Sequence, residues 1–186
     1  MNNHNSAIRI VLPALLLTAF VLTAPVQGAA VEGDSVQVSK LLSQAKAQAV
    51  HLSEDTSEME SFAQSDISWR SHVDAVDRIK EDVNLLGLQL AHLDAVRDTA
   101  SPWQKTAIDR ITPLLRELAS NTRAVIEDLN ESPRLRNTDG YRGYLETNFD
   151  DAAYLSSMIS GFVDYGKTKA RLDRLTSRLE LEPDGD

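Results

Sequence analysis

The sequence contains no cysteine among its 186 residues. This absence excludes disulfide bonds, thiol chemistry, covalent attachment of a c-type haem and a lipid anchored on cysteine. Signals of β-strands are also missing, because no run of alternating β-branched residues stands between turn residues. Glycine and proline number only eight and six, and those after residue 30 lie mostly near the expected helix ends. We therefore predict an all-α protein that is held together by side-chain packing alone.

The signatures of common helical cofactor sites and catalytic sites are missing as well. Di-iron carboxylate bundles need Glu-x-x-His on two helices, but a glutamine or a tryptophan stands three residues before each of the three histidines that follow position 30. No histidine follows His92, although haem-binding bundle cytochromes take an axial histidine late in the fourth helix. No G-x-S-x-G elbow occurs either. We therefore expect no cofactor, no catalytic residue and no enzymatic activity.

The first thirty residues have the pattern of a signal peptide. Arg9 precedes an apolar stretch from Ile10 to Ala24, and a run that is rich in small residues follows and ends at Ala30. A signal peptide has a charged start, a short apolar middle and small residues at its cleavage site. The apolar stretch here is shorter than a membrane span, which takes ~20 apolar residues. We expect cleavage near Ala30 and an exported protein, either periplasmic or secreted.

Removal of residues 1–30 leaves 156 of the 186 residues, which is enough for one domain with a real core. The removed segment holds one basic residue and no acid, so the net charge changes from −9 to −10 with neutral histidines. Such an acidic surface argues against nucleic acid or anionic lipid as the partner. No second apolar span follows, so we expect no membrane span after cleavage.

Four long helical patterns follow, over about residues 34–64, 68–98, 101–132 and 140–181. In each of them, core-type residues recur at alternating steps of three and four and form one seam. The seams are Val38, Leu42, Ala45, Ala49, Leu52, Thr56, Met59 and Ala63; Trp69, His72, Val76, Ile79, Val83, Leu86, Leu90 and Leu93; Ile108, Ile111, Leu115, Leu118, Thr122, Val125 and Leu129; and Leu145, Ala152, Leu155, Ile159 and Phe162. Short loops make neighbouring helices antiparallel, so we predict an up-down-up-down four-helix bundle over residues 31–181 and a disordered tail at 182–186. At 1.5 Å per residue the fourth helix is ~60 Å long, so its end should overhang the bundle.

The third helix has the sharpest predicted start. Ser101 serves as the N-cap, Pro102 takes the first helical position, and Gln104 follows three residues after the cap. In such a capping box the serine and glutamine side chains satisfy free backbone N–H groups reciprocally. We expect Ser101→Ala to cost about 0.5–2 kcal/mol of stability.

One nucleotide-binding motif matches in full. Residues 161–168 read Gly-Phe-Val-Asp-Tyr-Gly-Lys-Thr, which fits the phosphate-binding loop G-x-x-x-x-G-K-T. That loop needs a buried strand before it, whereas the residues upstream of Gly161 follow a helical pattern. We interpret Gly161 and Gly166 as positions that allow a close helix contact or a local bend.

His72 stands on the apolar seam of the second helix, and two interpretations are open. In the first, it is a core imidazole that is bonded to a carboxylate or a tyrosine hydroxyl, as buried polar groups usually are. In the second, His72, Glu60 and Asp128 form a metal or small-ligand site together with a tyrosine. Folding the helices back at their loops places these residues at similar heights in the bundle.

The end of the fourth helix is basic and carries a narrow apolar stripe. The basic residues are Lys167, Lys169, Arg171, Arg174 and Arg178, and the stripe is Leu172, Leu175 and Leu179. Cations suit the C-terminal end of a helix dipole. The stripe either packs on the start of the first helix or forms a seam of the coiled-coil type for docking or self-association.

Two stretches resemble uncharacterised exported helical proteins of bacteria. They run from Ser68 to Ile111, through Ser-Trp-Arg-Ser-His and Ala-Ser-Pro-Trp-Gln-Lys-Thr-Ala-Ile-Asp-Arg-Ile, and from Asp164 to Ala170. The resemblance implies a bacterial, exported protein and no particular activity. The chain lacks the L-T-x-x-Q repeat of small helical periplasmic chaperones. Taken together, we predict a non-enzymatic interaction or structural module of the cell envelope, with the metal- or ligand-binding bundle as the alternative.

Overall fold

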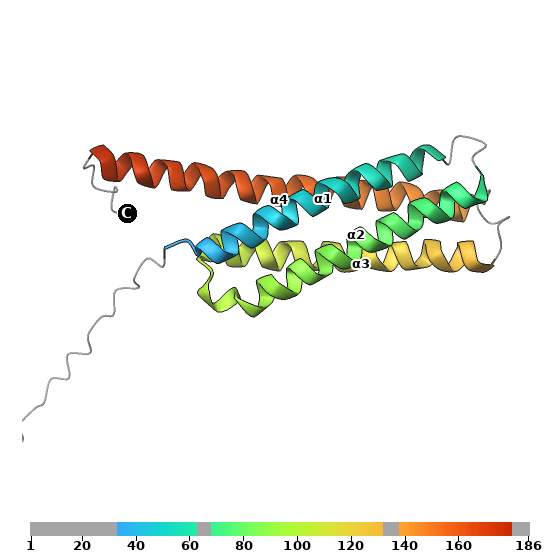
Figure 1. Ribbon diagram of the computed structural model, residues 1–186, viewed down its shortest axis with the longest axis horizontal. Helices are drawn as coiled ribbons and strands as arrows, with labels where there is room; N and C mark the ends of the chain where they lie inside the picture. The colour runs from blue at the N-terminus through green and yellow to red at the C-terminus, as the bar shows by residue number, and fades with distance from the viewer. Residues whose placement is uncertain (1–32, 63–67, 132–137, 180–186) are drawn as a thin grey trace, which may run out of the picture. The chain divides into compact units, whose positions relative to one another are not determined.

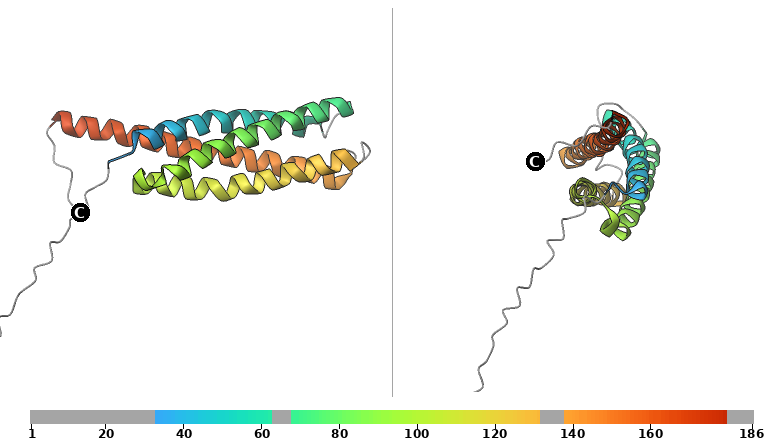
Figure 2. Two further views of the ribbon diagram at one scale, coloured as in Figure 1. Left: turned by 60° about the horizontal axis from the view of Figure 1, so that its bottom comes forward. Right: turned by 90° about the vertical axis from the view of Figure 1, so that its left-hand side faces the viewer.

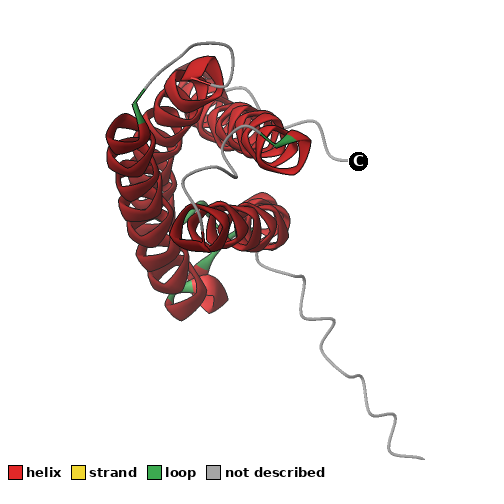
Figure 3. Ribbon diagram, turned by 90° about the vertical axis from the view of Figure 1, so that its right-hand side faces the viewer, coloured by secondary structure: helices red, strands yellow, loops and turns green. Residues whose placement is uncertain are grey.

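The computed structural model describes residues 33–62, 68–131 and 138–179, all within the compact unit Glu32–Asp186. Its elements are α1 (Val36–Phe62), α2 (Trp69–Ala95), the short 3-10 helix η1 (Arg97–Thr99), α3 (Pro102–Glu131) and α4 (Asp139–Leu179). No strand occurs in these described ranges, and Figure 3 shows helices and short loops alone. The all-α prediction with four long helices is therefore confirmed. The proposed signal peptide over residues 1–30 and the tail at 182–186 lie outside the described residues.

The four helices pack around a common core, and consecutive helices run in opposite directions (Figure 1). Both α1 and α3 pack against α2 and α4. At 41 residues, α4 is much longer than α1 and α2, which have 27 residues each. Figure 2 shows its last turns running past the start of α1. The end of α4 therefore has no neighbouring helix beside it among the described elements.

The predicted seams form the core. Each described seam residue is buried except Trp69 and Phe162, which are partly buried; Ala63 of the first seam lies outside the described residues. Each fully buried Leu or Ile contributes about 1.5–3 kcal/mol by its removal from water. The seams missed six buried positions, which are Ala75, Gln104, Ala107, Tyr141, Asn148 and Val163. Three-and-four spacing thus locates the centre of each apolar face, but not its full width.

Residues 161–168, which match the phosphate-loop motif, lie inside α4 and are all helical. A Cβ atom at Gly166 would lie 2.7 Å from Cη2 of Trp103, so this glycine permits the close approach of α3 to α4. A Cβ atom at Gly161 would meet nothing within 4 Å. The predicted close contact is therefore present at Gly166 and absent at Gly161, and α4 continues through both.

None of the helices in the described part of the chain is both long enough and apolar enough to cross a membrane.

Candidate functional site

His72 lies in the core and contacts a tyrosine hydroxyl. Its side chain is 3% exposed, and its Nδ1 atom lies 3.0 Å from the hydroxyl oxygen of Tyr141 on α4. The ring of Phe62 packs edge-on against the imidazole, with 5.6 Å between the centroids. This is the bonding expected when a buried imidazole ties two helices together.

The alternative metal set of His72, Glu60 and Asp128 draws its residues from three helices, α2, α1 and α3. Glu60 and Asp128 are partly buried on α1 and α3. Within the described ranges, no three His, Cys, Asp or Glu side chains form a group that could hold a metal ion.

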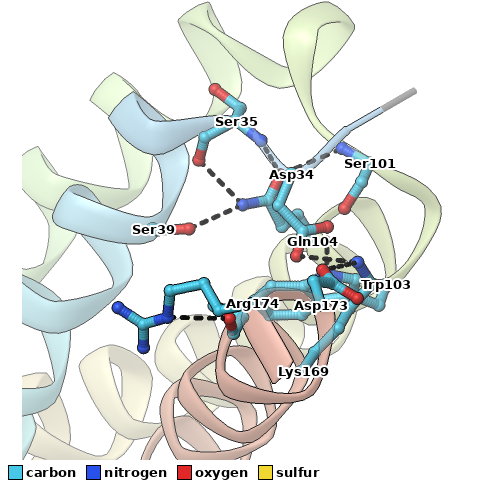
Figure 4. A network of polar contacts seen from close by, with 10 residues as sticks. Asp34, Ser35, Ser39, Ser101, Trp103, Gln104, Lys169, Asp173 and Arg174 are labelled. Atoms are coloured by element: carbon cyan, nitrogen blue, oxygen red, sulfur yellow. Dashed lines mark hydrogen bonds and ion pairs between the residues drawn. The ribbon is translucent and has the colours of Figure 1, made fainter. Parts of the chain in front are cut away.

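A polar network joins the N-terminal ends of α1 and α3 (Figure 4). Its centre is the fully buried side chain of Gln104. The Oε1 atom of Gln104 accepts from the backbone N–H groups of Ser35 and Ser101, each at 3.0 Å. Its Nε2 atom donates to the carbonyl of Ser35 and the hydroxyl of Ser39, each at 2.9 Å. One amide thus uses both its ends to fix the start of two helices that are distant in sequence.

The capping-box prediction is confirmed only for its glutamine half. Gln104 accepts from the backbone of Ser101 as predicted. The Ser101 hydroxyl is buried and makes no hydrogen bond that would cap α3. The serine half of the box is therefore not made, whereas the Gln104 amide also bonds to Ser35 and Ser39 at the start of α1.

The ring of Trp103 is held from three sides. Its indole N–H donates to Oδ1 of Asp34 at 2.7 Å, and its six-membered ring lies against the backbone of Gly166. The ring of Tyr165 packs on it in a T-shaped arrangement, with 5.3 Å between the centroids. Lys169 completes the cluster through an ion pair with Asp34 at 3.3 Å.

This environment lowers the pKa of Asp34 below its ordinary value of 3.8. Burial alone would raise the pKa, but the polar side chains of Ser101 and Trp103 and the charge of Lys169 act in the opposite direction and prevail. The stability that ionised Asp34 contributes is therefore complete above about pH 3.8 and is lost as the pH falls through the lowered pKa.

Beside this cluster, α3 and α4 form a groove of about 400 Å³, which we call the aromatic groove. It is lined by Trp103, Thr106 and Arg110 of α3 and by Met158, Gly161, Phe162 and Tyr165 of α4. Three aromatic rings and a thioether give it an apolar interior, and one guanidinium group stands among them. The sequence prediction missed this groove, because Phe162 was assigned to the core and Trp103 only to a helix start. Aligning α3 and α4 as antiparallel neighbours would have placed Trp103 near Tyr165.

The stripe of Leu172, Leu175 and Leu179, which we call the leucine stripe, is open to solvent. Its side chains are 62%, 44% and 62% exposed. The alternative in which the stripe packs on the start of the first helix is therefore wrong, because α4 has already passed that point (Figure 1). Tyr165, Leu172 and Leu179 recur every seven residues, so the stripe continues the α4 wall of the aromatic groove.

Comparison with protein-family models, with curated proteins and with solved structures found no match to this chain.

Proposed function

We propose that this protein is an exported, non-enzymatic helical bundle that acts as an interaction module of the cell envelope. Its docking surface is the leucine stripe at the overhanging end of α4, and the partner is a protein that offers an acidic amphipathic helix. The observation that carries this proposal is the exposure of three leucines at three-and-four spacing on a helix with no neighbour among the described elements. Such a stripe is half of a coiled-coil seam.

The charge of this segment indicates the chemistry of the partner. Residues 167–179 contain five basic side chains and one acid, Asp173, and Lys169 forms an ion pair with Asp173 at 3.0 Å. The whole chain carries a net charge of −9, so the positive charge at the end of α4 is segregated from an acidic remainder. A helix with leucines facing the stripe and acids flanking it would satisfy both features, whereas two overlaid copies of this segment would repel each other.

Export is supported by the pattern of residues 1–30 alone, and it has its own test. Expression in a bacterial host followed by fractionation should place the mature chain outside the cytosol. N-terminal sequencing should begin at or near Val31. An unprocessed chain retained in the cytosol would contradict the export part of the proposal and leave the docking part to be judged separately.

The docking surface can be tested by site-specific crosslinking. The chain has no cysteine, so a single introduced cysteine is the only position that a thiol-reactive crosslinker labels. A thiol-reactive photo-crosslinker on Leu175→Cys should give one discrete adduct in the native envelope. The matched control is Leu88→Cys, because Leu88 is exposed to a similar extent, at 58%, and lies on α2, which is not among the helices packed against α4. Adding Leu172→Asp should abolish the Leu175→Cys adduct.

The crosslinked peptide identifies the partner surface by mass spectrometry. We expect a helical segment with leucines at three-and-four spacing and a net negative charge. Three outcomes would each overturn the proposed docking mode: equal labelling from both cysteine positions, no adduct from Leu175→Cys, or a basic crosslinked segment.

A further inference from the structure

We infer that the aromatic groove binds a small apolar carboxylic acid, with its hydrocarbon or aromatic body between the rings and its carboxylate on Arg110. This inference rests on the groove alone and does not depend on the proposed docking of a partner helix.

The groove has the size and lining of a small-molecule site. Its volume of about 400 Å³ falls within the range of ~300–1,000 Å³ that is typical of ligand pockets. Such pockets are mostly apolar and contain a few polar groups that orient the ligand. Here the apolar part comes from Trp103, Met158, Phe162 and Tyr165. Gly161 keeps the groove open, because it places no side chain there and a Cβ atom would find empty space.

The wall of the groove is fixed before any ligand arrives. Trp103 is held by the 2.7 Å hydrogen bond to Asp34, by contact with Gly166 and by the edge of Tyr165. A side chain that is already ordered loses little conformational entropy on binding. The indole N–H is also engaged by Asp34, so the tryptophan offers the ligand an apolar face rather than a donor.

Arg110 determines the charge of the ligand. It forms no ion pair within the described part of the chain. The neighbouring carboxylate of Asp109 is engaged by Arg97, whose Nη2 atom lies 2.8 Å from its Oδ2 atom. The planar guanidinium of arginine matches a carboxylate with two parallel hydrogen bonds. The Tyr165 hydroxyl, which makes no hydrogen bond to a described residue, is a second donor at the same groove.

Decanoate is a suitable probe, because it combines a flexible apolar chain with one carboxylate. Isothermal titration with the full chain should show saturable binding of one decanoate per protein. Gly161→Leu should abolish this binding, because the new side chain fills the groove. The variant should still fold, because its Cβ atom meets nothing within 4 Å and leucine has the higher helix propensity. Gly143→Leu is the matched control on α4, since a Cβ atom there also meets nothing within 4 Å and the position is outside the groove.

Two further comparisons test the role of Arg110 and the location of the ligand. Arg110→Met should weaken decanoate binding by about 10-fold or more, and decanol should bind the wild-type protein and Arg110→Met equally. Leu175→Asp should leave decanoate binding unchanged, which separates the groove from the leucine stripe. No binding of decanoate at millimolar concentration, or binding that Gly161→Leu leaves intact, would overturn the inference. Equal affinity for decanoate and decanol in the wild-type protein would overturn the assignment of Arg110.

Discussion

At the scale of single residues, the side-chain amide of Gln104 links the starts of two helices. Gln104 makes four hydrogen bonds, and three of its partners are backbone groups at the starts of α1 and α3. A buried amide that bonds to backbone groups of two helices fixes the position of one helix start relative to the other. Its loss would leave the backbone N–H groups of Ser35 and Ser101 without the acceptor they share.

Gln104→Ala should therefore destabilise the protein by about 2–4 kcal/mol, because it removes four buried hydrogen bonds and leaves a small cavity. Ser101→Ala should cost less than about 0.5 kcal/mol, because its hydroxyl caps nothing. Urea unfolding followed by circular dichroism measures both values. A larger loss in Ser101→Ala than in Gln104→Ala would show that the serine, not the glutamine, stabilises the start of α3.

Asp82 on α2 is a residue whose charge opposes folding. Burial raises its pKa above the ordinary value of 3.8, and the neighbouring carboxylate of Asp55 adds to the shift. The hydrogen bond from Gln48, at 2.6 Å, and the nearby His51 act in the opposite direction without cancelling it. The folded state therefore binds this proton more tightly than the unfolded state does, and stability falls as the pH rises from below 3.8 through the raised pKa.

Asp82→Asn should accordingly stabilise the protein at pH 7, by up to about 1 kcal/mol for a charge that is only partly buried. The gain should shrink as the pH falls toward 3, because the wild-type carboxyl group is then neutral as well. Thermal unfolding between pH 3 and pH 7 measures this trend, and Asp74→Asn on the exposed face of α2 controls for the loss of one charge. A gain that is independent of pH would show that the charge of Asp82 is not its cause.

At the scale of the helix, the two glycines of α4 have opposite effects on stability. Gly161→Ala should stabilise the protein by about 0.5–1 kcal/mol, because alanine is the better helix former and meets no neighbour. Gly166→Ala should destabilise it by about 1–3 kcal/mol, because the new methyl group would lie 2.7 Å from the Trp103 ring and force it to move.

The fluorescence of Trp103 checks the cause of the Gly166→Ala effect, in a Trp69→Phe background that leaves a single tryptophan. Its emission maximum should shift in Gly166→Ala, as the ring leaves Asp34 and Tyr165, and should stay unchanged in Gly161→Ala. Equal stability changes at the two positions would contradict the close contact of α3 and α4 at Gly166.

The helices themselves were predictable from the sequence because their signal is local. The spacing of Ile108, Ile111 and Leu115 requires only that one face of a helix be apolar, and all three are buried. The aromatic groove and the Gln104 network were not predictable in the same way. Their partners, such as Ser35 with Gln104, stand 69 residues apart, and a capping pattern within four residues gives no sign that the glutamine will turn to another helix. The predicted helix boundaries differ from the observed ones by a few residues. The reason is similar, because the end of a helix depends on partners outside that helix.

At the scale of the whole molecule, the length of α4 divides this helix into a part that shares the core and a part that is exposed. Its first part shares the core, where Leu155 and Ile159 are fully buried. Beyond Val163 no α4 residue is buried in the described range. A helix of 41 residues that packs on helices of 27 and 30 residues cannot be covered along its whole length. The uncovered end should therefore add little to the stability of the fold, which is what the proposed docking role of its leucines requires.

Ending the chain after Ala170 should therefore leave the bundle folded, with a melting temperature within about 2–4 °C of the full chain, which corresponds to about 1 kcal/mol at this size. Decanoate binding should also persist, because every residue that lines the aromatic groove is retained. Leu155→Asp is the matched control on the same helix and should unfold the protein, because it places a charge in the core. Thermal melts by circular dichroism measure the stability of both variants. Unfolding of the shortened chain would mean that the leucine stripe stabilises the fold rather than binding a partner.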